Sequence, residues 1–158
     1  LVLVRLKLRP AGFPEHYTAH PAFAEAWQRL EMTVGGNMVF RRSVLLACGG
    51  FPQDALFRRF GGEDAALGIA LTRAAVVGTL FGDNDPAVIH NHRPGIHAEK
   101  LLDAALFGKI PDGMTAQHQA EAEAVTQRIC AAVEGLKTTL SFGQTGITAL
   151  QADYGGEN

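Results

Sequence analysis

Three pairs of adjacent glycines dominate the middle of this chain, at Gly35-Gly36, Gly49-Gly50 and Gly61-Gly62. Glycine adopts positive backbone φ angles at little cost, and without a Cβ it lets the backbone approach a ligand or a neighbouring strand closely. We therefore expect a turn or a close approach at each pair. The third pair is followed directly by two carboxylates, Glu63 and Asp64, at the start of a predicted helix.

The two adjacent carboxylates cannot share one role. On a helix through residues 63–73, Glu63 lies on the same side as the apolar Leu67 and Leu71. Asp64 lies about 100° further round the helix axis. One carboxylate can therefore brace the turn or hold a ligand while the other faces an open cleft as a general base. The alternative is structural, because acidic residues in a first helical turn are stabilised by free backbone N–H groups and by the helix dipole.

The glycine pairs also belong to a longer pattern in residues 35–71. It runs Gly-Gly-Asn-Met-Val-Phe-Arg-Arg-Ser from Gly35, Gly-Gly-Phe-Pro from Gly49, and Phe-Gly-Gly-Glu-Asp-Ala-Ala-Leu-Gly-Ile-Ala-Leu from Phe60. This pattern resembles the acceptor-side segment of GT-A glycosyltransferases, most closely the family 2 enzymes and the C-terminal galactosyltransferase-type domain. Several spaced elements agree rather than a single motif, and the likeness extends more loosely to His92.

The resemblance implies an α/β fold. It would be a partial GT-A-like (nucleotide-diphospho-sugar transferase) fold, with a short mixed sheet flanked by helices and a C-terminal helical extension. Residues 1–110 would form the acceptor and catalytic portion, and residues 111–158 a helix and tail in the same compact unit.

The resemblance also implies a reaction, the transfer of a sugar from a nucleotide-diphosphate donor such as a UDP-sugar to a carbohydrate or other hydroxyl acceptor. Asp64 resembles the catalytic base that takes the proton of the acceptor hydroxyl, which implies inversion at the anomeric carbon. By the same likeness, the acceptor-binding positions are Glu63, Phe60, Gly61 and Gly62, and the loop beside the donor sugar contains Gly35 and Gly36.

A second group of polar residues lies in His90-Asn91-His92-Arg93. On a strand, His90 and His92 point to the same face, and such imidazole pairs bind a divalent metal or donate hydrogen bonds to a diphosphate or sugar. The resemblance supports Mn²⁺ or Mg²⁺ at His92 or His90, because GT-A enzymes often place a histidine after this strand pair. We expect Arg93 to bind the donor by neutralising the departing diphosphate. The alternative is that these histidines lie at a solvated strand end.

Nothing before residue 35 resembles the nucleotide-binding half of such an enzyme, and no Asp-x-Asp motif precedes that position. Asp83-Asn84-Asp85 follows the Glu-Asp helix and has the composition of a turn. We therefore expect the chain to be the carboxyl-terminal part of a longer enzyme, or a remnant that lost its donor half. A remnant would act as a non-catalytic carbohydrate-binding or scaffold domain.

Composition is that of an ordinary globular protein, with 47% hydrophobic and 19% charged residues. The net charge of −2 gives no electrostatic reason to expect a nucleic-acid partner. No apolar run approaches the roughly 20 residues of a bilayer-spanning helix. Cys48 and Cys130 are too few for a disulfide framework. We therefore expect reduced thiols and a cytoplasmic protein, or one peripheral to the inner membrane face.

Residues 1–9 alternate between apolar even positions and mostly basic odd positions, which predicts a half-buried strand with Arg5 on its basic face. Further strands are predicted over residues 33–40, 75–81 and 87–91, and helices over residues 22–30, 43–47 (with Ser43 as N-cap), 97–107 and 115–137.

The helix of residues 115–137 carries an apolar stripe at Val125, Ile129, Val133 and Leu136. We expect it to cap the fold or to contact a partner. Residues 141–158 lack a clear period and are expected to form a loosely held tail.

Overall fold

The computed structural model of the chain describes residues 1–137, 140–143 and 146–150. Within these residues, the central element is a four-stranded mixed sheet in which β1 pairs with each of the other strands. The strands are β1 (Leu3–Ala11), β2 (Met38–Phe40), β3 (Val77–Leu80) and β4 (Ala87–Asn91). β2 is antiparallel to the start of β1, whereas β3 and β4 are parallel to its first and second halves. The predicted α/β class with a short mixed sheet is confirmed.

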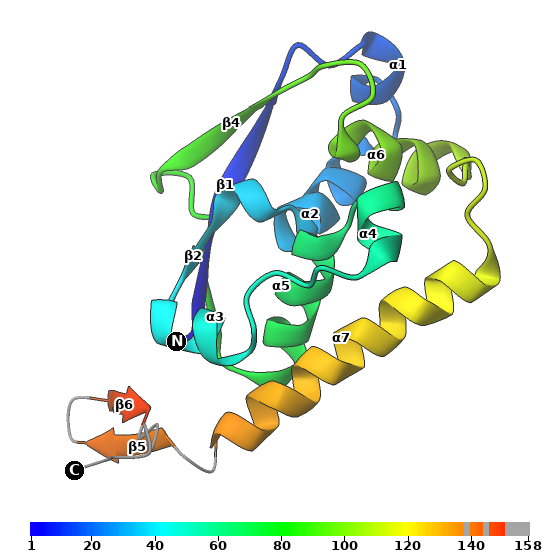
Figure 1. Cartoon of the computed structure of the whole chain (residues 1–158). Helices are drawn as coiled ribbons and strands as arrows, with labels where there is room; N and C mark the ends of the chain where they lie inside the picture. Colours follow the sequence, from blue (N-terminus) through cyan, green and yellow to red (C-terminus); the bar gives the residue numbers. More distant parts are fainter. Residues whose placement is uncertain (138–139, 144–145, 151–158) are drawn as a thin grey trace.

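Helices α2 and α5 lie against one face of this sheet, and α7 crosses the far side of α5 (Figure 1). The helices are α1 (Glu15–Thr18), α2 (Phe23–Thr33), the short 3₁₀ helix η1 (Gly35–Asn37), α3 (Arg42–Ala47), α4 (Ala55–Phe60), α5 (Glu63–Ala74), α6 (His97–Phe107) and α7 (Ala116–Lys137). None of those in the described ranges is long and apolar enough to cross a membrane.

After α7, β5 (Leu140–Gly143) pairs antiparallel with β6 (Gly146–Leu150). The predicted loose tail of residues 141–158 lies in large part outside the described residues.

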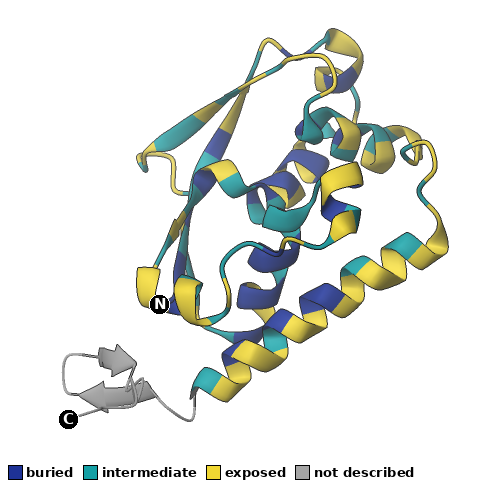
Figure 2. Ribbon diagram, in the orientation of Figure 1, coloured by how far each residue is buried: buried dark blue, intermediate teal, exposed yellow. Residues whose placement is uncertain are grey.

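Two clusters of buried apolar residues hold the elements together. Figure 2 shows where the buried residues lie along the ribbon. The first joins β1, α5 and α7, and includes Leu3, Leu67, Leu71, Val125, Ile129 and Val133. The second joins β1, α2 and α6, and includes Leu8, Trp27, Leu30, Ala98 and Leu102. Because each fully buried aliphatic or aromatic side chain contributes about 1.5–3 kcal/mol, these clusters supply the main stabilising free energy.

The prediction that Arg5 lies on the exposed face of its strand is wrong. Leu3 and Arg5 are buried in the first half of β1 and Leu8 in the second, whereas Val4 and Leu6 are only half-buried. The buried positions are therefore odd-numbered in the first half of β1 and even-numbered at Leu8 in the second half. A single alternation of buried and exposed positions does not describe the whole strand.

Arg5 is buried because it closes the carboxyl end of α2. Its Nη1 donates hydrogen bonds to the carbonyl oxygens of Glu31 and Val34, at 3.2 and 3.4 Å. The last carbonyls of a helix lack intrahelical donors, and a cation there also interacts favourably with the helix dipole. Gly68 of α5 leaves the space, since a Cβ at that position would lie 2.2 Å from the Arg5 Nη2.

Side chains from α2 and η1 bind the backbone of β1 beyond the end of its pairing with β2. Glu31 Oε1 accepts from the Leu8 N–H at 3.1 Å, and Trp27 Nε1 donates to the Leu8 carbonyl at 3.0 Å. Asn37 Nδ2 donates to the Leu6 carbonyl at 2.6 Å. These side chains thus supply hydrogen bonds to the β1 backbone where β2 has ended, and they hold η1 against β1.

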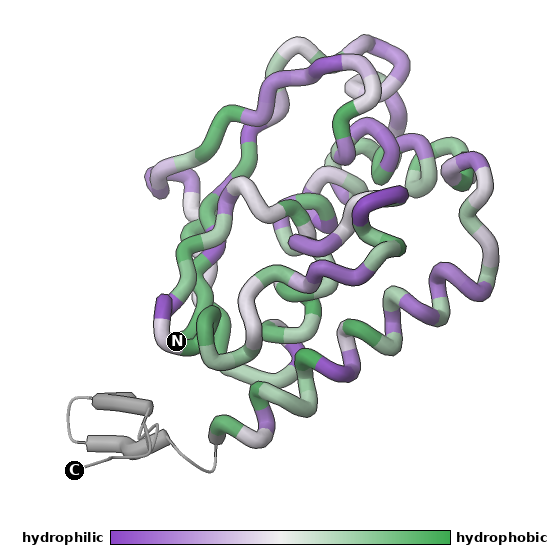
Figure 3. The backbone as a smooth tube through the Cα atoms, in the orientation of Figure 1, coloured by the Kyte–Doolittle hydropathy of each residue, from purple (hydrophilic) through white to green (hydrophobic). Residues whose placement is uncertain are grey.

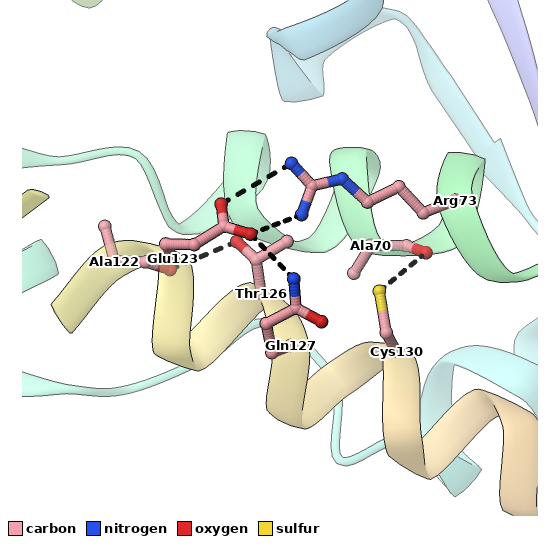
Figure 4. A network of polar contacts seen from close by, with 7 residues as sticks. All are labelled: Ala70, Arg73, Ala122, Glu123, Thr126, Gln127 and Cys130. Atoms are coloured by element: carbon pink, nitrogen blue, oxygen red, sulfur yellow. Dashed lines mark hydrogen bonds and ion pairs between the residues drawn. The ribbon is translucent and has the colours of Figure 1, made fainter. Parts of the chain in front are cut away.

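The apolar stripe predicted on α7 packs inside the chain. Val125, Ile129 and Val133 are at most 5% exposed and belong to the first cluster with α5. Figure 3 shows hydrophobic residues alternating with hydrophilic ones along this helix. Beside the stripe, Arg73 of α5 forms an ion pair with Glu123 of α7 at 2.6 Å (Figure 4). Because α5 covers the stripe, a partner of α7 would have to contact its other faces.

Some local predictions differ from the structure. Ser43 is the second residue of α3, whose N-cap is Arg41. The short helices α1 and α4, of four and six residues, are not predicted, because so few residues show no clear period. Only residues 38–40 of the predicted strand 33–40 are a strand, since η1 occupies residues 35–37.

Candidate functional site

Gly61 and Gly62 turn the chain from α4 into α5. Their φ angles are 73° and 98°, in the left-handed region where a side chain would be strained. Gly62 is the N-cap of α5, so Glu63 and Asp64 begin the helix as predicted. The two carboxylates therefore project in different directions from the first turn.

The carboxylate of Asp64 is held by backbone amides. Its Oδ2 accepts a hydrogen bond from the Gly35 N–H at 2.7 Å, and its Oδ1 accepts one from the Ala65 N–H at 2.8 Å. A Cβ at Gly35 would lie 2.7 Å from the Asp64 Cβ, so this approach requires glycine. The structure brings together the residue predicted as the base and one of the glycines predicted to lie beside the donor.

A buried positive charge interacts with Asp64. Burial lowers the pKa of Arg5 to about 10, and the Asp64 carboxylate opposes this shift. The guanidinium therefore stays protonated at neutral pH. Its Nε and Nη2 have no hydrogen-bond partner among the described residues. The charge of Asp64 thus compensates part of the cost of burying this cation.

The residues predicted to bind the acceptor do not gather around Asp64. Phe60, Gly61 and Gly62 line a cavity of about 370 Å³ between α4, α5, α6 and α7. Glu63 and Asp64 are not among the lining residues of this cavity. The predicted acceptor residues are thus divided between two sides of the start of α5.

The cavity is mainly apolar, with a few polar groups. Its apolar walls include Phe57, Ile69, Leu101 and Met114. His97 also lines it, and the His97 Nε2 is buried without a hydrogen-bond partner in the described part of the chain. An apolar pocket with a few polar groups is the usual form of a small-molecule site. The sequence did not predict this cavity, because four helices from different parts of the chain build it. The glycine turn before α5 was the only local feature that pointed to it.

His90 and His92 share a face, as predicted, and both rings contact Phe13. His92 Nε2 pairs with a carboxylate oxygen of Glu99, and this hydrogen bond is the main cause that lowers the pKa of Glu99. Burial lowers the pKa of His90, whose Nε2 has no partner among the described residues. These side chains are partly buried and packed, so neither lies at a solvated strand end.

Within residues 1–137, 140–143 and 146–150, no group of three or more His, Cys, Asp or Glu side chains could hold a metal ion. Gly36 and Arg93 are exposed. No hydrogen bond or ion pair in the described part of the chain joins the Arg93 side chain to Asp64 or Gly35.

No family model, curated protein or solved structure matches this chain. The candidate site therefore depends on the geometry at Asp64 and on the resemblance within residues 35–71.

Proposed function

We propose that this chain is the acceptor-side portion of an inverting glycosyltransferase of the GT-A type. It transfers a sugar from a nucleotide-diphosphate donor to a hydroxyl acceptor, with Asp64 as the general base. The observation that carries the proposal is the 2.7 Å hydrogen bond between the Gly35 N–H and the Asp64 Oδ2. It joins two segments that the resemblance assigns to the donor side and the base, although they are far apart in sequence.

The chemistry of transfer explains why a carboxylate is needed. A sugar hydroxyl is too weak an acid to attack unaided, so a base must take its proton as the new bond forms. A single base opposite the leaving group gives one displacement with inversion. The Gly35 and Ala65 amides orient the Asp64 carboxylate before the reaction, which reduces the reorganisation needed in the transition state.

The departing diphosphate needs positive charge, which a divalent metal or a cationic side chain supplies. The two imidazoles fit a divalent metal poorly, because His92 Nε2 is engaged by Glu99 and His90 Nε2 is buried beside aromatic rings. No step of the proposed transfer therefore requires a metal at these histidines. In this proposal the exposed Arg93 neutralises the leaving diphosphate.

A second candidate function is a non-catalytic carbohydrate-binding or scaffold domain. It is favoured by the same contacts, since both oxygens of Asp64 already accept backbone N–H groups. Such a carboxylate also serves as a structural clamp between η1 and α5. If Asp64 is the base, its replacement removes sugar transfer. If Asp64 is only a clamp, its replacement affects the fold and not a reaction.

The test replaces Asp64 with asparagine. Asp64→Asn is expected to lower transfer from UDP-sugars by about 10²–10⁴-fold, the usual contribution of a general base. The matched control is Asp85→Asn, because the Asp85 carboxylate also accepts a glycine N–H, from Gly82 at 2.8 Å. The control should keep full transfer. Release of nucleoside diphosphate measures the reaction, and circular dichroism checks the fold.

Titration of UDP-sugars, with and without Mn²⁺, against the unmodified chain separates the two candidate functions. A chain that transfers sugar by itself must bind the donor, whereas a remnant without the donor-binding half binds carbohydrate alone. Transfer that is unchanged in Asp64→Asn would refute the role of this carboxylate as the base.

A further inference from the structure

The apolar cavity opens beside a second hollow that carries positive charge. The first, of about 370 Å³, and the second, of about 440 Å³, share Phe60, Lys100, Ile110 and Pro111. Ile110 is 61% exposed at this junction. Helix α6 and the segment after it therefore present a continuous surface that is apolar at one end and charged at the other.

The apolar part has the size of a small-molecule site. A cavity of about 150 Å³ holds one benzene molecule, and pockets for drug-sized ligands begin near 300 Å³. The volume of about 370 Å³ thus suits a chain of about ten carbons or a fused aromatic group. Gly62, Ala65 and Ala66 of the α4–α5 junction leave this space open, because their side chains are small or absent.

The charged part favours an anion. Arg59, Lys100 and Lys109 line the second hollow, and no ion pair joins them to a carboxylate in the described part of the chain. Of the two carboxylates there, Asp103 accepts a hydrogen bond from the Tyr17 hydroxyl at 2.6 Å. Three cations thus line this hollow together with two carboxylates, which leaves an excess of one positive charge.

Lys100 lies where the two parts meet, because it is a lining residue of both. His97 of the same helix lines the apolar part with its unpartnered Nε2. A ligand with an apolar body in the cavity would therefore place a polar head group next to Lys100. The first turn of α6 supplies both polar contacts from residues one turn apart.

We propose that this joint site binds an anionic amphiphile, with an apolar chain of about ten carbons in the cavity and a carboxylate or phosphate head at Lys100. The cavity contains Phe60, Gly61 and Gly62, which the resemblance assigns to the acceptor, but Asp64 lines neither part, so binding here can be tested apart from glycosyl transfer. The test measures binding without a sugar donor.

The probes are decanoate and decyl phosphate, compared with decanol and decylammonium, each titrated calorimetrically below its micellar concentration. All four share the ten-carbon chain and differ in the head group. At least one anion should bind at a single site about fivefold more tightly than decanol, with decylammonium weakest. The tighter of the two anions identifies the head group. Equal binding of anions and decylammonium, or no saturable binding of either anion, would overturn the proposal.

Two neighbouring alanines of α6 provide a matched pair of variants. Ala104 and Ala105 are both exposed, but only Ala104 lines the cavity. Ala104→Leu should weaken binding of the better anion about tenfold by filling the cavity, whereas Ala105→Leu should leave it unchanged. Lys100→Gln should remove the preference for the anion over decanol while decanol binding persists. If the better anion binds to Ala104→Leu as tightly as to Ala105→Leu, its hydrocarbon chain does not occupy this cavity.

Discussion

At the residue scale, the contact between Gly35 and Asp64 decides how the candidate site is built. A glycine amide and a carboxylate meet at 2.7 Å, and the same glycine leaves no room for a Cβ. The next residue, Gly36, has open space where its Cβ would be. The two glycines of this pair are therefore not equivalent, although the sequence makes them look alike.

This difference gives a prediction for single substitutions. Gly35→Ala should destabilise the protein by about 1–3 kcal/mol, because the added methyl group pushes Asp64 away and breaks a charge-assisted hydrogen bond. Gly36→Ala is the matched control and should range from neutral to about 1 kcal/mol more stable, since it restricts the unfolded chain. Urea unfolding measures both. Equal free energies of unfolding for the two variants would contradict the contact.

Arg5 shows a second residue-scale effect. Its cation is fully buried, between the end of α2 and the backbone of α5, with Asp64 as an opposing charge. A buried charge is tolerated only where donors and opposite charges compensate it. Arg5 thus links the carboxylate of the candidate site to the packing of α2 on the sheet.

At the element scale, α7 is held to α5 mainly by its apolar stripe. Ile129 lies in this stripe and is 4% exposed. The ion pair between Arg73 and Glu123 lies at the surface, with side-chain exposures of 46% and 51%. Surface ion pairs contribute little, because water already solvates both charges.

The two kinds of contact should therefore differ in energy. Ile129→Ala should lower the free energy of unfolding by about 2–5 kcal/mol, because it removes buried methyl groups and leaves a cavity. Glu123→Ala on the same helix should cost much less, because water already solvates both charges of its ion pair with Arg73. Urea unfolding of the two variants checks the order. A larger loss for Glu123→Ala would mean that charge, not burial, docks α7.

At the scale of the whole molecule, the two apolar clusters share β1 and the contact between α2 and α5. The single tryptophan, Trp27, belongs to the second cluster. Both cysteines pack against the first cluster and form no disulfide. The chain thus contains a natural reporter for each cluster.

These reporters predict one cooperative transition in urea. Trp27 fluorescence and the reactivity of Cys48 and Cys130 toward a thiol reagent should change with the same midpoint, as a two-state domain requires. Destabilising the first cluster with Ile129→Ala should shift both midpoints together. Different urea midpoints for the two signals would indicate two independent units.

The sequence by itself determined the elements whose signals are local. The helix of residues 97–107 was predicted with its bounds, because Gly108 marks its end, and Gly108 caps α6 with a φ of 65°. The strand of residues 87–91 and the start of α5 at Glu63 were also predicted correctly. Periodicity and glycine turns act over a few residues, so they can be recognised without the rest of the chain.

Only the tertiary structure decided which face of β1 is buried, which amide binds Asp64 and where the apolar cavity lies. Arg5 contacts Glu31 and Val34, and Asp64 contacts Gly35, across separations that local patterns do not reach. Four helices must pack before the cavity beside Gly61 and Gly62 exists. Such features depend on the free energy of packing between distant segments, and no local period in the chain encodes them.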